Sequence, residues 1–208
     1  MTGRFISLEG GEGVGKSTQL AALADALRAR GLDPLITREP GGSAGAEAIR
    51  ALLLEGEAGR WGPRAEALLF AAARADHLEK TILPALAAGR WVLSDRFLDS
   101  SRAYQSGASG LADADILTLH RIGSEGRMPD RTLLLQLPAN VAYARTRVRD
   151  RDGTDRIGGR GLLYHAQIAP AFARYATEEP ERFRVVDALG LPHMVTARLV
   201  AALADLLP

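Results

Sequence analysis

The chain has 208 residues, of which 47% are hydrophobic and 25% charged, and its formal net charge is +1. This length suits one domain with, at most, a small lid, and so small a charge gives no overall field that would attract a nucleic acid polymer or an anionic membrane. The absence of cysteine excludes disulfides and thiolate metal sites, and the lack of a leader-like N-terminus or a membrane-length apolar run favours a cytoplasmic protein.

Short apolar runs alternate with segments of helical periodicity along the chain. The runs predict five strands, at residues 5–8, 35–37, 91–95, 132–137 and 183–186. The periodic segments predict helices from about residue 16 to Gly31, at 44–54, 63–87 and 113–125, from about 139, and at 162–177 and 191–207. Strands that alternate with helices are joined by right-handed crossovers, so the sheet should be parallel. We predict one α/β domain, residues 1–208, with a five-stranded parallel sheet and helices on both faces.

A glycine-rich turn joins the first strand to the first helix. Gly10, Gly15, Lys16 and Ser17 satisfy the spacing G-x-x-x-x-G-K-[ST] in the strand, turn and helix context that this motif requires. Glycines let successive N–H groups point into one concavity, and the helix adds the positive end of its dipole, so amides can hold a polyphosphate. The alternative is a turn that only connects two elements. The complete motif instead predicts a nucleoside triphosphate site made of Gly10, Gly11, Glu12, Gly13, Val14, Gly15, Lys16, Ser17 and Thr18.

Residues beyond the loop narrow the kind of nucleotide-binding protein. Guanine-binding switches carry an N-K-x-D element, whereas the only asparagine here, Asn140, is followed by Val141. The chain is also too short to carry the accessory domains of most motors. A small phosphotransferase is therefore favoured.

Four segments, in matching order and spacing, carry a family resemblance. They are E-G-G-E-G-V-G-K-S-T (9–18), T-R-E-P-G-G (37–42), D-R-F-L-D-S-S-R-A-Y-Q (95–105) and an arginine-rich segment ending in D-R-I (155–157). Together they resemble the thymidylate kinases, which are P-loop nucleoside monophosphate kinases. The resemblance implies a three-layer P-loop NTPase fold, transfer of the ATP γ-phosphoryl group to dTMP in dTTP biosynthesis, a Mg²⁺ cofactor, and a homodimer packed through helices around residues 44–80 and 109–125.

Phosphoryl transfer depends mainly on alignment and positive charge, because its transition state is loose. Lys16, magnesium and arginines should therefore do most of the catalysis. Asp95, at the end of its predicted strand, could hold magnesium together with the Ser17 hydroxyl, and Arg96 would then grip the acceptor phosphate. The alternatives are that Asp95 caps a helix or loop and that Arg96 forms a surface ion pair.

Further residues are expected to bind the acceptor nucleotide. The resemblance implies that Phe70 stacks on thymine and that Arg74, on the same helix face, reaches a ring oxygen. The residues alone would favour the alternative, with Phe70 in the core and Arg74 in solvent. Tyr104 matches a tyrosine that crowds the sugar 2′ position. The other substrate-binding positions implied by the resemblance are Glu12, Glu39, Pro40, Arg50, Arg96, Ser101 and Gln105.

The arginine-rich segment, about residues 147–161, resembles a lid that closes on ATP and excludes water. Positions 11–14 of the phosphate loop contain no basic residue, so the chain resembles family members that supply an arginine from the lid. We expect Arg149 or Arg151 to reach the transferring phosphate and Arg156 to contact the adenine or its phosphates. A solvated helix end, balanced by neighbouring aspartates, is the alternative.

Some positions depart from the family pattern, and other functions stay open. Gly158 stands where glutamate is usual, Gln136 where aspartate is common, and Ser106 where glycine is usual. Alternative functions are a kinase for another nucleoside monophosphate or a deoxynucleoside, and a nucleotide-binding regulator without transfer activity. The strictness for dTMP over dUMP does not follow from the sequence.

Overall fold

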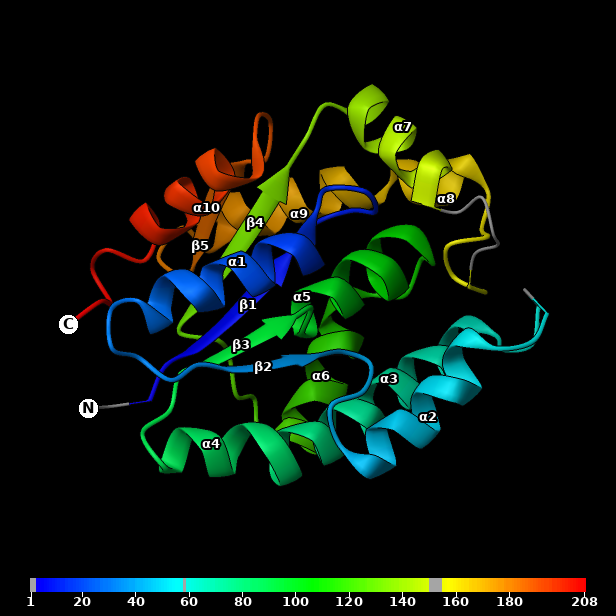
Figure 1. Cartoon of the computed structure of the whole chain (residues 1–208). Helices are drawn as coiled ribbons and strands as arrows, with labels where there is room; N and C mark the ends of the chain where they lie inside the picture. Colours follow the sequence, from blue (N-terminus) through cyan, green and yellow to red (C-terminus); the bar gives the residue numbers. More distant parts are fainter. Residues whose placement is uncertain (1–2, 58, 150–154) are drawn as a thin grey trace.

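The computed structural model describes residues 3–57, 59–149 and 155–208. A parallel sheet of order β2-β3-β1-β4-β5 forms its centre (Figure 1). The strands are β1 (Phe5–Glu9), β2 (Leu35–Arg38), β3 (Val92–Asp95), β4 (Arg131–Gln136) and β5 (Phe183–Asp187). The predicted α/β fold with a five-stranded parallel sheet is confirmed.

Helical segments connect the strands and cover the sheet. Their bounds are α1 (Lys16–Arg28), α2 (Ala44–Leu54), α3 (Pro63–His77), η1 (Leu78–Ile82), α4 (Leu83–Ala87), α5 (Leu98–Ser101), η2 (Arg102–Ala108), α6 (Asp113–Ser124), α7 (Ala139–Arg149), α8 (Leu162–Ala166), α9 (Ile168–Glu178) and α10 (Pro192–Ala201). The helix predicted at 63–87 is present but contains the π-helical turn η1, and the helix predicted at 162–177 is divided at Gln167. Among the described residues, no helix is both long and apolar enough to cross a membrane.

The two faces of the sheet carry separate cores, because side chains alternate along each strand. On one face, Ile6, Leu8 and Leu133 are fully buried against α1 and α10. On the other face, Phe5 packs with residues of α3, η1, α4 and α6, while Leu134 packs with η2 and α9. The strands β1, β3, β4 and β5 contribute buried apolar residues to both faces, as expected for a parallel sheet that helices cover on both sides. Figure 1 shows these helices.

The helical stretch formed by α5 and η2 was not predicted. Its position depends on Asp99, which is fully buried and accepts hydrogen bonds from Arg182 Nη1 at 2.6 Å and from Thr132 Oγ1 at 3.1 Å. Arg102 adds an ion pair to the same carboxylate at 3.3 Å. These partners come from the start of β4, the turn before β5 and η2 itself, so contacts distant in sequence stabilise this stretch.

The carboxyl ends of the central strands meet at one edge of the sheet. In the β1–β3 register Leu8 lies beside Asp95, and in the β2–β3 register Arg38 lies beside the same residue. The turn after β3 therefore lies between the turns after β1 and β2. Ligands of open parallel sheets bind at this edge.

Candidate active site

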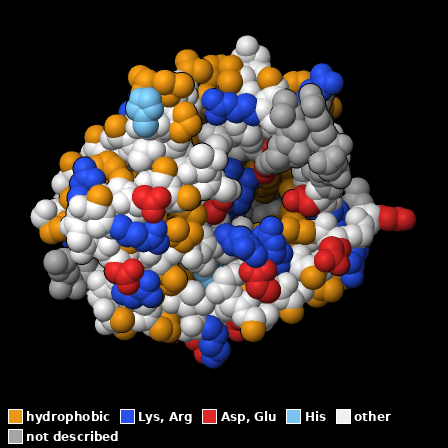
Figure 2. Space-filling model, in the orientation of Figure 1, with side chains coloured by type: hydrophobic (Ala, Val, Ile, Leu, Met, Phe, Trp, Pro, Cys, Tyr) orange, Lys and Arg blue, Asp and Glu red, His pale blue; other side chains and the backbone are white. Residues whose placement is uncertain are grey.

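A cleft of about 650 Å³ opens at the carboxyl edge of the sheet. The space-filling view shows a hollow bordered by Lys and Arg side chains (Figure 2). Its lining includes most residues that the sequence analysis singled out: Glu12, Gly13, Val14, Gly15, Lys16, Ser17, Thr18, Glu39, Pro40, Arg50, Phe70, Arg74, Asp95, Arg96, Ser101, Tyr104 and Gln105. Elements more than 90 residues apart thus contribute to one cavity.

The turn from β1 to α1 has the geometry of an anion-binding loop. Gly13 adopts a φ of 73°, and a Cβ there would lie 2.4 Å from the Ala142 carbonyl oxygen, so only glycine fits. Gly15 precedes α1 with a φ of 95°, and no side chain caps the helix. The first N–H groups of α1 are therefore free of a side-chain acceptor and can bind an anion.

Lys16 folds back over this loop. Its Nζ donates to the carbonyl oxygens of Gly10 at 3.0 Å and Gly11 at 2.8 Å, and its side chain is buried. Burial, and then the positive charge of Arg96, lower the pKa of Lys16 to about 8. A phosphate in the loop would supply the negative charge that favours the ammonium form.

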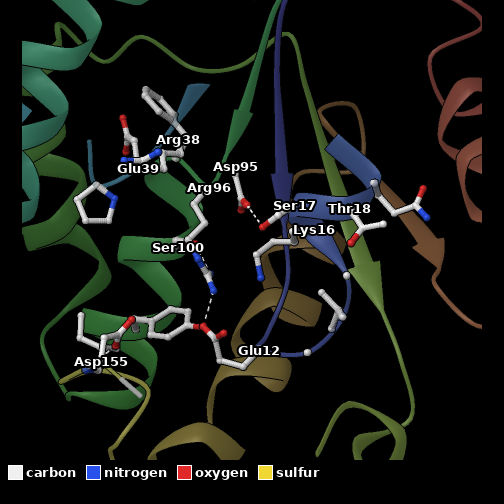
Figure 3. A pocket seen from close by; sticks show the side chains of 18 of the residues that line it. Glu12, Lys16, Ser17, Thr18, Arg38, Glu39, Asp95, Arg96, Ser100 and Asp155 are labelled. Atoms are coloured by element: carbon white, nitrogen blue, oxygen red, sulfur yellow. Dashed lines mark hydrogen bonds and ion pairs between the residues drawn. The ribbon is translucent and has the colours of Figure 1, made fainter. Parts of the chain in front are cut away.

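Ser17 and Asp95 face one another at the mouth of the loop (Figure 3). Ser17 Oγ donates to Asp95 Oδ2 at 2.8 Å. Hard cations such as Mg²⁺ take hydroxyl and carboxylate oxygens and complete their shell with phosphates and water. In the described parts of the chain no three His, Cys, Asp or Glu side chains group as ligands. The pair fits an ion shared with a nucleotide rather than one held by protein alone.

Arg96 lies between the phosphate loop and the deeper part of the cleft. Its backbone has a left-handed φ of 72°, which is strained for a residue with a side chain. Its guanidinium donates to Glu12 Oε1 at 2.6 Å and to the Tyr104 hydroxyl at 3.2 Å. Glu9 supports the same segment, because its carboxylate accepts from the Phe97 N–H at 2.8 Å. The strained turn and these partners hold the Arg96 side chain at the centre of the cleft (Figure 3).

Phe70 and Arg74 line the cleft from one face of α3, as their spacing predicted. Arg74 is buried, and its Nε donates to Glu39 Oε2 at 2.8 Å while Nη2 donates to Ser101 Oγ at 2.6 Å. Arg74 is therefore not in solvent. Phe70 is half-buried, packing on a core cluster while also lining the cavity, so one part of the ring can meet a ligand.

Two contacts between predicted substrate-binding residues lie beside this pocket. Pro40 lines the cleft, and its carbonyl oxygen accepts from Arg50 Nη1 at 2.6 Å. The Tyr104 hydroxyl donates to Glu12 Oε1 at 3.2 Å, which links the base side of the cleft to the phosphate loop. Pro40 and Arg50 thus contact each other, as do Tyr104 and Glu12.

Of the lid arginines that were predicted to act at the nucleotide, Arg156 has a described side chain. It is buried beside the cleft, where Nε donates to the Leu53 carbonyl oxygen at 2.7 Å and Nη2 to Glu66 Oε2 at 2.5 Å. Arg149 is the last residue of α7. Arg151 lies outside the described residues. The assignment of a transferring-phosphate arginine to this segment stays a prediction.

Some residues that line the cleft were not assigned a role from the sequence. Arg145, on α7, lies close to the phosphate loop, and its Nη1 is 3.9 Å from where a Cβ on Gly15 would stand. Past Thr18, the far end of the cleft is formed by Ala188, Gly190, Pro192 and Val195. These residues follow β5, and only their position after a parallel strand could have indicated a binding role.

Comparisons with known proteins agree with this geometry. The family model described as thymidylate kinase matches residues 8–198. A thymidylate kinase of Rhizorhabdus wittichii is 64% identical over 208 residues, covering 100% of both chains. One from Caulobacter vibrioides is 50% identical over 200 residues, covering 95% of this chain and 94% of the relative.

A solved structure is also similar throughout. The crystal structure of thymidylate kinase from Ehrlichia chaffeensis aligns with a TM-score of 0.78 at 27% identity, covering 98% of this chain and 99% of that one. Both the sequence match and the fold therefore extend across the phosphate loop, the cleft and the segment after β5. The chain belongs to the thymidylate kinase family.

Proposed function

We propose that this chain transfers the γ-phosphoryl group of ATP to dTMP, giving ADP and dTDP. The observation that carries the proposal is one continuous cleft with the uncapped phosphate loop at one side and the Phe70–Arg74 pocket at the other. Arg96 touches both sides, through Glu12 and through Tyr104 (Figure 3). Two nucleotides bound end to end in such a cleft would bring their phosphates together beside Lys16 and Arg96.

The ATP half of the reaction is assigned to the phosphate loop. Backbone N–H groups of residues 10–18 hold the β- and γ-phosphates, and Lys16 moves from its carbonyl acceptors to the transferring group. Arg145 adds positive charge from α7. The adenine occupies the far end of the cleft, against Gly190 and Pro192. Arg149 or Arg151 completes the charge around the transferring group when the lid, about residues 147–161, closes.

The dTMP half is assigned to α3, β2 and the stretch after β3. Phe70 stacks on the base, and Tyr104 packs against the sugar. Arg96 and Arg50 hold the acceptor phosphate, where planar guanidinium groups suit bidentate contacts. Glu39 keeps Arg74 aligned through their buried ion pair. The acceptor phosphate then faces the γ-phosphate in line.

Mg²⁺ is proposed as the cofactor, held by Ser17 and Asp95. A bound magnesium ion supplies positive charge to the phosphate oxygens of ATP. Asp95 would coordinate the metal, or accept hydrogen bonds from its waters, in place of the hydrogen bond it now receives from Ser17. The two side chains are the only direct protein ligands that we assign.

A homodimer is proposed through α2, α3 and α6, which lie together on one side of the molecule (Figure 1). The side chains of Leu68 on α3 and Ile122 on α6 are 55% and 74% exposed. Exposed apolar side chains on packed helices are stabilised when a second chain covers them. The cytoplasmic location predicted from the sequence stays a prediction.

A coupled ADP-release assay tests the function. We expect turnover with ATP, Mg²⁺ and dTMP, and weaker turnover with dUMP, dCMP, dGMP and thymidine. A clear preference for another acceptor would overturn the assignment of dTMP. ATP binding with no acceptor-dependent turnover would instead indicate a nucleotide-binding protein without transfer activity.

A further inference from the structure

Glu66 of α3 joins three side chains from distant parts of the chain, and none of the roles above uses it. Its carboxylate is fully buried. Oε2 accepts from Arg156 Nη2 at 2.5 Å and from Arg160 Nη2, while Oε1 accepts from Gln105 Nε2 at 3.1 Å. The two arginines lie within the proposed lid, about residues 147–161, and Gln105 lines the cleft.

These contacts determine which end of the Gln105 amide faces Glu66. A carboxylate that forms ion pairs with two guanidinium groups acts only as an acceptor. The amide nitrogen of Gln105 must therefore point to Glu66, and its carbonyl oxygen must point away. This Oε1 atom is buried and has no hydrogen-bond partner within the described part of the chain. An unsatisfied buried acceptor in a cavity wall indicates that a ligand donor belongs there.

The neighbouring Arg74 supplies the complementary group. A guanidinium has donors and no acceptor, and Arg74 lines the same pocket beside Phe70. The pocket thus presents a fixed donor and a fixed acceptor. A pyrimidine that carries a carbonyl oxygen next to a ring N–H satisfies both groups, as thymine and uracil do. Cytosine presents an amino group and an unprotonated ring nitrogen at this edge, so it opposes both.

We propose that Glu66 is a positioning residue for base selection: it orients Gln105 so that the cleft offers an acceptor to the ring N–H of the substrate. The charge that makes Glu66 an obligate acceptor is held in place by Arg156 and Arg160. Glu66 itself does not touch the base. The inference rests on the proposed function, because it concerns which pyrimidine nucleotide that site accepts.

The substitution Glu66→Gln tests the orientation directly. The arginines have only donors, so the new amide oxygen stays with them and the new amide nitrogen faces Gln105. Gln105 must then turn its carbonyl toward residue 66 and its amide nitrogen toward the cleft. We expect the ratio of kcat/KM for dTMP to that for dCMP to fall about 10- to 100-fold, since a mismatched buried hydrogen bond has an effect of this order. The KM for ATP should stay within about twofold.

Two matched variants distinguish a change in the orientation of the Gln105 amide from a general loosening of the cluster around Glu66. Glu79→Gln removes the same charge from an exposed position on η1 and should leave the dTMP to dCMP ratio unchanged. Arg160→Met weakens the cluster but leaves Glu66 paired with Arg156, so the ratio should again be unchanged even if stability drops. In a Gln105→Met background, Glu66→Gln should alter the ratio no further.

Equal losses for dTMP and dCMP in Glu66→Gln would overturn the proposal and leave Glu66 a purely structural residue. If circular dichroism shows that this variant does not fold, the wild-type chain can still be used to test the orientation of Gln105. Its kcat/KM should fall about 10- to 100-fold when the ring nitrogen of dTMP is methylated, and equal use of both nucleotides would refute the orientation of Gln105. Wild-type protein that ignores dTMP altogether would remove the proposed function itself, a result distinct from either of these.

Discussion

Raising the pH should inactivate the free enzyme by deprotonating the ammonium group of Lys16. Burial, followed by the charge of Arg96, lowers the pKa of this lysine from 10.5 to about 8. The shift corresponds to about 3 kcal/mol against the charged form. About nine tenths of the lysine is then charged at pH 7 and about one tenth at pH 9, so kcat/KM for ATP should fall about tenfold over this interval.

The assay is an initial-rate profile between pH 7 and 9.5 at saturating dTMP, a range in which nucleotide phosphates, with a pKa of about 6, are already ionised. Bound phosphate favours the ammonium form, so the fall in kcat should occur at higher pH than the fall in kcat/KM. The matched variant is Lys16→Arg. A guanidinium keeps its proton throughout this range, so the remaining activity of this variant should not show the alkaline fall.

Titration of Glu9 is the alternative explanation for an alkaline fall in kcat/KM. Burial, and then the charge of Asp99, raise its pKa to about 8, so it titrates in the same range as Lys16. The variant Glu9→Gln should keep the alkaline fall in kcat/KM if Lys16 is responsible. The reasoning is refuted if Glu9→Gln abolishes the fall while Lys16→Arg retains it.

Phe70→Ala should raise the KM for dTMP about 10- to 100-fold and change the KM for ATP little, because stacking on a base is worth about 1–3 kcal/mol. An equal rise in the KM values for dTMP and ATP would indicate that Phe70 has only a core role. His120 is buried, its Nε2 pairs with the Arg127 carbonyl oxygen at 2.9 Å, and burial lowers its pKa to about 4. In the unfolded chain His120 binds a proton below about pH 6.5, whereas in the folded chain it does so only near pH 4. The free energy of unfolding should therefore fall by up to about 3 kcal/mol as the pH is lowered from 6.5 to 4. Urea denaturation should show a smaller loss of unfolding free energy for His120→Gln than for the wild type over that pH interval. An equal loss in both proteins would show that groups other than His120 cause it. Ile122→Glu should convert the proposed dimer to monomer in sedimentation velocity, whereas Glu125→Gln, at the exposed end of the same helix, should not.

Features that contiguous residues encode could be predicted from the amino-acid sequence. The phosphate loop at 10–18 could be predicted because its glycines, Lys16 and Ser17 act through local backbone geometry. Short apolar runs predicted the strands, and their alternation with helices predicted the parallel sheet. The shared helix face of Phe70 and Arg74 followed from their spacing alone.

The contacts between polar side chains from distant parts of the chain could not be predicted in this way. Glu39 and Arg74 lie 35 positions apart, and Gln105 lies 39 positions from Glu66, so no local pattern could reveal either pair. The helical stretch after β3 escaped prediction for the same reason, since a buried Asp99 anchors it to Arg182. The contact of Arg156 with Glu66, a buried carboxylate on α3, likewise joins residues 90 positions apart. Partners of buried charges depend on how the elements pack, and packing joins residues that the order of the chain keeps apart.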